Sequence, residues 1–495
     1  MTRQQLCTKL SSVLHWGILF LLVATPLAFG TVHVWAFSLM ELAIFLLVAI
    51  WMILNLLQPQ TSVLRQMSPS ILWPIALFVA LIFLQLIALP PPLLKLISPN
   101  TYALYDQAHA GLFSSWSPLS LNPSATRLEL HRILASTAMF FLVFIHFRDR
   151  GQVKRLVITL ILVGSFISLL GLFQYYSGTK KIYWFRDTSY ASPFGPYVNR
   201  NHFAGYMAML LPLGIGYFLA RASRLWDRLR QAWKHGHLAR RLASEPEMNQ
   251  GLLLLLCLLV MAGALFISLS RGGVLSFLGA MVFLGLLLAS RRLQAGWGRG
   301  FLALCALMAL AILWFGIDPL LARFAASVDP QELTLREERF KVLPILLHMA
   351  SSFPALGVGL AAFSSLFPLY QAAEIKSKFL QAHSDWLQLL TDTGGIGVGL
   401  ALWFLVAFGI CVLRRWGERR DPFVRMVSVG ALAGIVGIVF HSVGDFNLQI
   451  PANALLLATL LALALGTLEI EGRPVRRKRL RRYQHSDEVP FLPSP

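Results

Sequence analysis

Long apolar stretches alternate with short polar segments along the chain. Twelve of the stretches have the length of about 17 to 25 residues that lets an α-helix cross the hydrocarbon core of a bilayer. We predict a helix for each, because lipid offers no partner to an unpaired backbone group. The pattern thus predicts an all-α, polytopic integral membrane protein with about twelve transmembrane helices, at residues 12–30, 34–57, 71–89, 131–147, 156–176, 202–220, 251–269, 273–290, 300–317, 394–413, 424–441 and 450–468.

Composition supports this interpretation. Hydrophobic residues make up 56% of the 495 residues, charged residues make up 13%, and the mean hydropathy is +0.64. A soluble domain carries about twice that share of charge. Soluble multidomain enzymes, disordered chains, collagens and disulfide scaffolds are therefore excluded. Three of the four cysteines lie inside apolar stretches, and Cys7 precedes the first one, so we expect small buried hydrophobes and no disulfide framework.

The positive charge is unevenly distributed between the two sets of loops. The formal net charge is +20, and 29 of the 43 Lys and Arg residues lie in the set that includes both termini. Basic loops mark the cytoplasmic side, so both termini are predicted to be cytoplasmic. Residues 1–470 are predicted to form one membrane domain. Residues 471–495 are predicted to form a basic tail beside anionic lipid, which is favoured over nucleic-acid binding.

The opposite side carries the longer loops, at residues 90–130, 177–200 and 318–393. The loop at 318–393 is long enough to contain helices of its own, and long loops of this kind are usually functional. No internal repeat suggests a transporter built from duplicated halves. Candidate chemistry is therefore expected where polar residues interrupt the apolar pattern on this side.

The first interruption is the segment 268–273, which contains Arg271 followed by two glycines. The glycines are expected to permit a tight turn that holds the arginine near the outer interface. An arginine at this position either extends its guanidinium toward water from a helix end or binds an anion, and the sequence favours neither.

The second interruption places Asn199, Arg200, Asn201 and His202 at the predicted start of a helix. The N–H groups and the dipole at a helix N-terminus favour an anionic ligand. Capping explains one asparagine but not all four polar residues. Aromatic residues precede the segment, and they fit either sugar stacking or an interfacial aromatic belt.

The remaining candidates lie in the long loop and before the last span. Arg336 and Arg339 share one helical face, although Glu337 and Glu338 can neutralise them in a solvated surface helix. His383 and Asp385 precede the tenth span, and this histidine is a candidate general base. Asp445 and Asn447 lie between the last two spans, where a simple polar turn is equally plausible.

No metal-ligand spacing, phosphate-binding loop, dinucleotide fingerprint or nucleophile elbow is present, so we expect neither a metal nor another cofactor. Arginines without a carboxylate cage favour an anionic substrate that guanidinium groups neutralise. A diphosphate attached to a membrane lipid fits both this chemistry and the location.

In its polar motifs the chain resembles the O-antigen ligase and polymerase superfamily of bacterial envelopes. The resemblance covers most of the chain and is strongest from about residue 190 to 455. It rests on Val198-Asn-Arg-Asn-His-Phe-Ala-Gly205, Ser268-Leu-Ser-Arg-Gly-Gly273, Arg339, Phe353-Pro-Ala-Leu-Gly-Val-Gly-Leu-Ala-Ala-Phe363, His383-Ser-Asp-Trp-Leu387 and Asp445-Phe-Asn-Leu-Gln-Ile-Pro-Ala-Asn453.

The resemblance implies an inverting, metal-independent glycosyltransferase of the bacterial inner membrane whose site faces the periplasm. The implied donor is a glycan on undecaprenyl diphosphate. Arg271 and Arg339 match the diphosphate-binding arginines with Arg336 as an alternative, and His383 matches the histidine that activates or positions the acceptor hydroxyl. Ser384 stands where the family usually has asparagine.

The sequence is compatible with several alternative functions. Within the family, the acceptor is a lipid-borne glycan for a ligase, another lipid-linked repeat for a polymerase, or a side chain for a protein glycosyltransferase. A transporter of an anionic lipid-linked sugar would use the same arginines, but it predicts charge near mid-membrane and internal symmetry. A purely structural scaffold leaves the Arg, Asn and His set unexplained.

Overall fold

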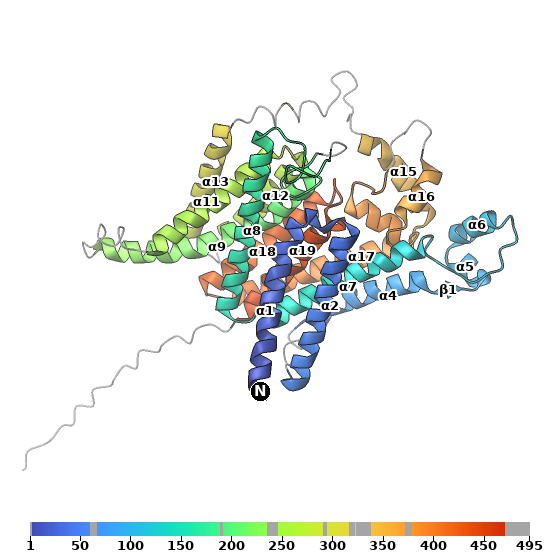
Figure 1. Ribbon diagram of the computed structural model, residues 1–495, viewed down its shortest axis with the longest axis horizontal. Helices are drawn as coiled ribbons and strands as arrows, with labels where there is room; N and C mark the ends of the chain where they lie inside the picture. Colours follow the sequence, from blue (N-terminus) through green and yellow to red (C-terminus); the bar gives the residue numbers. More distant parts are fainter. Residues whose placement is uncertain are drawn as a thin grey trace, which may run out of the picture.

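The computed structural model describes residues 2–59, 67–188, 192–234, 246–290, 295–315, 322, 338–371 and 379–470. The basic tail at 471–495 lies outside the described residues, as does Arg336. The described chain is almost entirely helical, which confirms the predicted all-α class (Figure 1).

Eleven helices in the described part of the chain are long and apolar enough to cross a membrane. They coincide with eleven of the twelve predicted spans, with ends that differ by several residues. The helices are α1 (Arg3–Leu27), α2 (Val34–Leu57), α4 (Pro69–Leu86), α7 (Pro123–His146), α8 (Arg150–Tyr176), α9 (Arg200–Lys234), α11 (Pro246–Ile267), α12 (Arg271–Ala289), α17 (Asp385–Glu418), α18 (Pro422–His441) and α19 (Pro451–Gly466). The remaining predicted span, 300–317, corresponds to α13 (Ala295–Phe315), whose described apolar part is Gly298–Leu310.

Three helices form the centre of the bundle. In the membrane-crossing segments of α9, α18 and α19, 94%, 83% and 83% of the residues are buried. In that of α17, 17% of the residues are buried. A β-carbon on Gly430 or Gly434 of α18 would lie 2.7 or 2.2 Å from a backbone oxygen of α9. Small residues let membrane helices approach closely where lipid provides no hydrophobic driving force. This close contact holds the end of α18 against α9.

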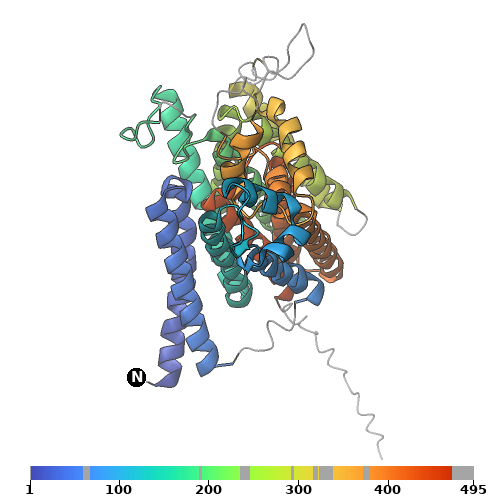
Figure 2. The ribbon, with the colours of Figure 1, turned by 90° about the vertical axis from the view of Figure 1, so that its right-hand side faces the viewer.

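The first two helices stand at the edge of the bundle. Figure 2 shows α1 and α2 as a long hairpin beside the other helices. Arg3–Leu27 packs against α8, and Val34–Leu57 packs against α7. Each makes its contacts along one side, which explains why many of their large apolar residues face outward.

Two connections build a small unit at one end of the bundle. Residues 87–122 contain α5 (Pro91–Ile97), α6 (Pro99–Ala108) and a two-residue antiparallel pairing of β1 (Ala88–Leu89) with β2 (Ser117–Pro118). The long loop contains α15 (Glu338–Ser352) and α16 (Phe363–Tyr370), which confirms the prediction that it has helices of its own. Side chains of the two connections share apolar clusters, such as Leu104 with Phe363. Both lie on the right of Figure 1.

Helix α17 begins nine residues before the predicted span because it continues across a kink. Gly394 interrupts it with φ 64° and ψ −169°. The segment 353–363 supplies the hydrogen bonds lost there: Gly395 and Ile396 donate backbone N–H groups to Pro354 and Ala355 at 2.7 and 3.2 Å. Unpaired backbone groups at membrane depth must find such partners in protein. The short helical segment before the kink therefore has a fixed position.

The four cysteines are free thiols; Cys7 is buried, whereas Cys257, Cys305 and Cys411 are only partly buried, so the expected burial is correct for Cys7 alone. Three short 3₁₀ turns, η1 (Phe29–Thr31), η2 (Asn447–Gln449) and η3 (Thr467–Glu469), complete the described secondary structure. The turn η2 belongs to the connection between α18 and α19.

Candidate functional site

The connection between α18 and α19, residues 442–450, gathers candidate residues from distant parts of the sequence. Asp385 at the start of α17 is buried there, and its Oδ2 atom accepts hydrogen bonds from the Ser442 hydroxyl at 2.7 Å and from the Leu448 backbone N–H at 3.1 Å. Its own backbone N–H donates to the carbonyls of Ser442 and Asp445. The carboxylate thus fastens α17 to the connection.

The ring of Phe446 lies between two predicted site histidines. The centroid of the His202 ring is 4.8 Å from that of Phe446, and the centroid of the His383 ring is 5.1 Å away, both at 75°. Edge-to-face contacts of this kind hold aromatic rings in defined orientations. His383 has a backbone φ of 51°, a region that residues other than glycine rarely adopt. Such strain often accompanies functional positions.

Asp445 is the buried acidic partner of His202. The distance from its Oδ1 atom to Nε2 of His202 is 3.6 Å, and both side chains are buried. Burial alone would raise the pKa of this carboxyl. The nearby imidazoles of His202 and His441, together with the Phe446 backbone N–H, outweigh burial and hold the pKa well below its ordinary range. Asp445 is therefore an anion at neutral pH.

A chain of amide hydrogen bonds runs from α9 to the end of α18. Asn453 donates from Nδ2 to the backbone oxygen of His202 and to Oδ1 of Asn447, both at 3.0 Å, while Tyr197 donates to its Oδ1 at 3.2 Å. Asn447 therefore has only its NH₂ group left for Nδ1 of His441, 3.0 Å away. His441 accepts at Nδ1, which leaves its proton on Nε2.

The N-terminus of α12 approaches the same histidine. A β-carbon on Gly272 would lie 3.0 Å from Nε2 and Cδ2 of His441, and one on Gly273 would lie 2.3 Å from the β-carbon of Ala204. The expected role of these glycines in a turn is wrong. The left-handed residue of the turn is Leu269, with φ 55°, whereas both glycines lie inside the helix and permit close packing. Arg271, the first residue of α12, directly precedes Gly272, the residue that lies against His441.

The starts of α12 and α9 are connected through Ser270. Its hydroxyl donates to Oδ1 of Asn201 at 2.9 Å and accepts the backbone N–H of Gly273 at 3.3 Å. Asn199 caps α9, because its Oδ1 atom accepts the backbone N–H of Asn201 at 2.9 Å. Arg200 donates its backbone N–H to Ser192. These bonds give Asn199 and Asn201 a structural role that does not depend on a ligand.

Ser384, which stands where the similar family usually has asparagine, is the N-cap of α17. Its hydroxyl accepts the Leu387 backbone N–H at 3.3 Å and so caps α17. It also lies 3.3 Å from the carbonyl of Ser442. Serine and asparagine are both preferred helix N-caps. The replacement therefore preserves the start of the helix that carries Asp385.

The described site thus brings together most of the residues predicted from the sequence. Side chains of His202, His383 and Asp385 contact the connection, which itself carries Asp445 and Asn447, and the start of α12 approaches it at His441. Arg339 lies on α15, and its side chain is outside the described residues, as is the whole of Arg336. Among the described residues, no group of three His, Cys, Asp or Glu side chains is arranged to hold a metal ion.

Several residues of the site were not predicted from the sequence. His441, Ser442, Phe446 and Asn453 all belong to one polar interruption between two apolar spans. That density of polar residues is the signal that could have identified them. Gln85 gives a weaker signal, as a single amide at the end of an apolar span. It donates to the backbone oxygens of Leu356 and Asp392 at 2.7 and 2.9 Å and so fixes the segment 353–363.

Comparison with known proteins identifies a family across the middle of the chain. Residues 256–403 match the model of the O-antigen ligase family, a range that includes Arg271, Arg339, His383 and Asp385. A comparison with curated proteins gives no match. The match over residues 256–403, in a chain with this membrane fold, supports membership of the O-antigen ligase superfamily.

Proposed function

We propose that the protein transfers a glycan from an undecaprenyl-diphosphate-linked donor to an acceptor at the periplasmic face of the bacterial inner membrane. The similarity of residues 256–403 to the O-antigen ligase family supports lipid-linked glycan transfer in surface polysaccharide biosynthesis. The observation that carries the proposal is the meeting of His383, Asp385, the His202–Asp445 pair and the start of α12 around the connection 442–450.

The reaction in this proposal is a single displacement without a metal. The acceptor hydroxyl oxygen attacks the anomeric carbon, the bond from that carbon to the diphosphate oxygen breaks, and the configuration inverts. His383 accepts the hydroxyl proton. The electron pair leaves with the diphosphate, which is a good leaving group and needs no strong acid.

Arginine chemistry suits the leaving group. Guanidinium groups make two parallel hydrogen bonds to phosphate and keep their charge at any physiological pH. Arg271 adds its charge to the N–H groups at the start of α12, and the two act on the same anion. We assign Arg339 as the second diphosphate ligand, with Arg336 as its alternative. Preorganised charge of this kind often makes the largest contribution to a rate.

The remaining predicted residues act at the periphery of the reaction. We propose that Asp385, Asp445 and Asn447 hold the connection in its reactive shape. Asn199, Arg200, Asn201 and His202 contact the sugars or phosphates of the donor. The ligase type, in which the acceptor is a lipid-borne glycan, is our preferred form of the reaction. A repeat-unit polymerase and a protein glycosyltransferase differ from it only in the acceptor.

Complementation tests this function. A strain without its own envelope-polysaccharide ligase or polymerase receives wild type, Arg271→Ala, Arg339→Ala or His383→Ala, and glycan profiles are compared at equal membrane expression. Removing one preorganised donor typically lowers a rate by about 100- to 1,000-fold, so each variant is expected to lose its glycan product. A ladder of bands indicates polymerisation, and a shift of an acceptor band indicates ligation.

Matched controls separate the site from general effects of lost charge. Arg414→Ala removes an exposed arginine at the other end of α17, and His109→Ala removes an exposed histidine of the connection 87–122. Both are expected to retain the wild-type profile. Site variants that work as well as wild type would show that these residues are structural and would reject their proposed roles in glycan transfer.

A further inference from the structure

Exposed aromatic side chains gather at the end of α8, on the connection between α8 and α9. Their exposed fractions are large: Tyr175 47%, Tyr176 67%, Trp184 48% and Phe185 72%. We call these four side chains the aromatic platform. Trp184 donates its indole N–H to the Ser177 hydroxyl at 3.2 Å, which holds the ring beside the end of α8. Figure 1 and Figure 2 show this connection at the end of α8, near the turn between α1 and α2.

The backbone of the platform has a fixed and strained shape. Tyr183 and Trp184 have φ of 55° and 62°, a region that residues other than glycine rarely adopt. The Tyr183 hydroxyl donates to the backbone oxygen of Leu27 at 2.5 Å, and its ring meets that of Phe29 edge-to-face with centroids 5.6 Å apart. These contacts hold the strained turn in place. Strain of this kind clusters at ligand-binding positions.

The connection that follows α8 lies beyond the hydrocarbon core of the bilayer. Helix α8 has 27 residues and so measures about 40 Å, whereas the core is about 30 Å thick. Even at a tilt of about 20° its end reaches past the core. Exposed charged residues flank Trp184 and Phe185 along the chain, namely Lys180, Lys181 and Asp187. Charged side chains are costly in lipid, so an apolar membrane anchor does not account for this mixture.

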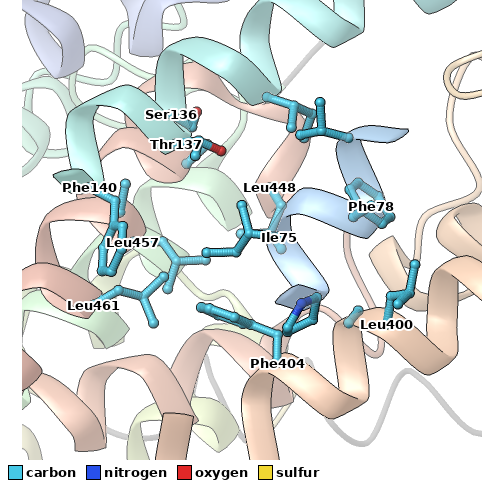
Figure 3. Close-up of a pocket in the computed structure, with 16 residues that line it drawn as sticks. Ile75, Phe78, Ser136, Thr137, Phe140, Leu400, Phe404, Leu448, Leu457 and Leu461 are labelled. Atoms are coloured by element: carbon cyan, nitrogen blue, oxygen red, sulfur yellow. The ribbon is translucent and has the colours of Figure 1, made fainter. Parts of the chain in front are cut away.

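The interior of the bundle contains a surface of the opposite character. A cavity of about 280 Å³ lies between α4, α7, α17 and α19, and fourteen of its sixteen lining residues carry hydrocarbon side chains. Figure 3 shows Ile75, Phe140, Phe404, Leu457 and Leu461 pointing toward one another around it. A sugar hydroxyl buried there without a hydrogen-bond partner would be costly. A carbohydrate therefore suits the platform and not this cavity.

Aromatic faces beside charged groups have the chemistry that recognises a carbohydrate. The C–H groups on one side of a sugar ring carry partial positive charge and pack on the negatively polarised face of an aromatic ring. The hydroxyl groups at the edge of the sugar then remain available to polar neighbours. Ammonium groups donate hydrogen bonds to them, and a carboxylate accepts hydrogen bonds from them. Lys180, Lys181 and Asp187 supply both kinds of partner.

Helix α8 connects the platform to the proposed site. The later part of the same connection, residues 192–199, packs on α8 before it enters α9. A β-carbon on Gly171 would lie 2.2 Å from the ring of Phe194, and one on Gly195 would lie 2.9 Å from the backbone oxygen of Ile167. Ser177 follows Gly171 by six residues, or about 9 Å along the helix. The platform is thus fixed further out than the segment that leads to the site.

We propose that the aromatic platform binds the glycan of the lipid-linked donor, several sugars beyond the reacting anomeric carbon. This inference rests on the proposed function and deepens it, because it makes an extended glycan the recognised substrate. Binding energy gained far from the reacting atoms can be used to hold the donor in its reactive position. A donor with a long glycan gains this energy, whereas a donor with one or two sugars does not.

Binding of soluble polysaccharide tests the platform without any reaction. Mild acid releases the envelope polysaccharide of the source bacterium from its lipid, and the chains are titrated onto purified protein in nanodiscs. We expect Trp184→Ala and Phe185→Ala each to weaken binding about fivefold or more, because an aromatic face is lost. Trp184→Tyr keeps such a face and should bind nearly as tightly as wild type. Trp116→Ala and Phe173→Ala remove other exposed aromatic side chains and should bind like wild type.

A fluorescent label separates a glycan platform from a membrane anchor. In protein whose four cysteines are replaced by alanine, Phe185→Cys or Phe173→Cys carries an environment-sensitive dye, in nanodiscs with nitroxide on the lipid acyl chains. Phe173 is an exposed residue inside α8, so its dye should be quenched by lipid. The dye at position 185 should escape quenching and respond to polysaccharide. Strong lipid quenching at position 185 without a response to polysaccharide would overturn the inference.

Chain length in the product distinguishes this inference from the proposed function. In the complementation strain, Trp184→Ala is expected to shift the product toward shorter glycans, whereas Trp116→Ala should keep the wild-type length. Wild type that transfers glycan but binds no polysaccharide would reject the platform alone. If wild type transfers no glycan, the proposed function fails, while polysaccharide binding that Trp184→Ala weakens would still support a carbohydrate site.

Discussion

At the scale of single residues, the direction of one hydrogen bond sets the state of a buried histidine. The backbone oxygen of His202 can only accept, so the Asn453 amide must turn its NH₂ group toward it. That orientation fixes Asn447, which then donates to Nδ1 of His441. Partners of this kind commonly fix the tautomer of a functional imidazole. The Nε2–H group of His441 consequently faces the start of α12.

Asn447→Asp tests this arrangement. A carboxylate only accepts hydrogen bonds, so the variant keeps the contact with Asn453 but forces a proton onto Nδ1 of His441. Glycan transfer is expected to fall about tenfold or more, which corresponds to roughly 1.4 kcal/mol. Raising the pH is not expected to restore it, because the remaining proton then stays on Nδ1. Transfer at the wild-type rate, in protein that remains monodisperse in detergent, would contradict the assigned tautomer.

At the scale of elements, the kinked helix α17 and the segment 353–363 hold each other in place. A β-carbon on Gly357 would lie 2.3 Å from the backbone of Asp392, and one on Gly394 would lie 2.3 Å from that of Ala355. The buried carboxylate of Asp392 accepts the backbone N–H groups of Ala361 and Phe363 at 2.9 and 3.1 Å. Because the segment 385–393 carries the proposed site, this interlock positions Asp385 relative to the connection 442–450.

Gly357→Ala is expected to disrupt this interlock. Gly357 has φ +68°, where a side chain costs about 1–2 kcal/mol, and the clash with the Asp392 backbone adds to that cost. The melting temperature of the purified protein in detergent should fall by several degrees. Gly399→Ala, on α17, has no heavy atom within 4 Å of its new β-carbon and should melt like wild type. Equal melting of the two variants would show that the interlock contributes nothing to stability.

At the scale of the whole molecule, the predicted orientation in the membrane rests on the distribution of charge over all loops. The loops and tails on the side of both termini hold 29 of 43 Lys and Arg residues. The connections that pack around the proposed site belong to the opposite set. The proposed donor and acceptor require that opposite side to face the periplasm.

Reporter fusions check the orientation. Green fluorescent protein after Pro495 should fluoresce, whereas alkaline phosphatase at that position should be inactive, because the tail is expected in the cytoplasm. The opposite pattern is expected for insertions at Gly111, where the backbone is a turn with open space around it. Active phosphatase after Pro495 would reverse the predicted topology and place the proposed site on the cytoplasmic side.

The sequence by itself determined the features that the surrounding bilayer requires, namely the membrane-spanning helices and the polar segments between them. Eleven of the predicted spans are present as helices, because a bilayer requires an apolar stretch of sufficient length and internally paired backbone. The polar interruptions that contain His202, His383, Asp385 and Asp445 were also visible, since charge and amide groups are conspicuous in an apolar chain. Their mutual distances were not, because contacts between helices depend on packing.

Tertiary structure decided which interruptions meet and what each polar group does. Gly272 and Gly273 were expected to form a turn, but close helix packing uses them instead. The kink at Gly394 is stabilised by hydrogen bonds to residues about 40 positions earlier in the chain, which no local pattern encodes. The protonated nitrogen of His441 likewise depends on Asn447, Asn453 and the backbone oxygen of His202. Only the folded bundle places each of these groups 3.0 Å from the next.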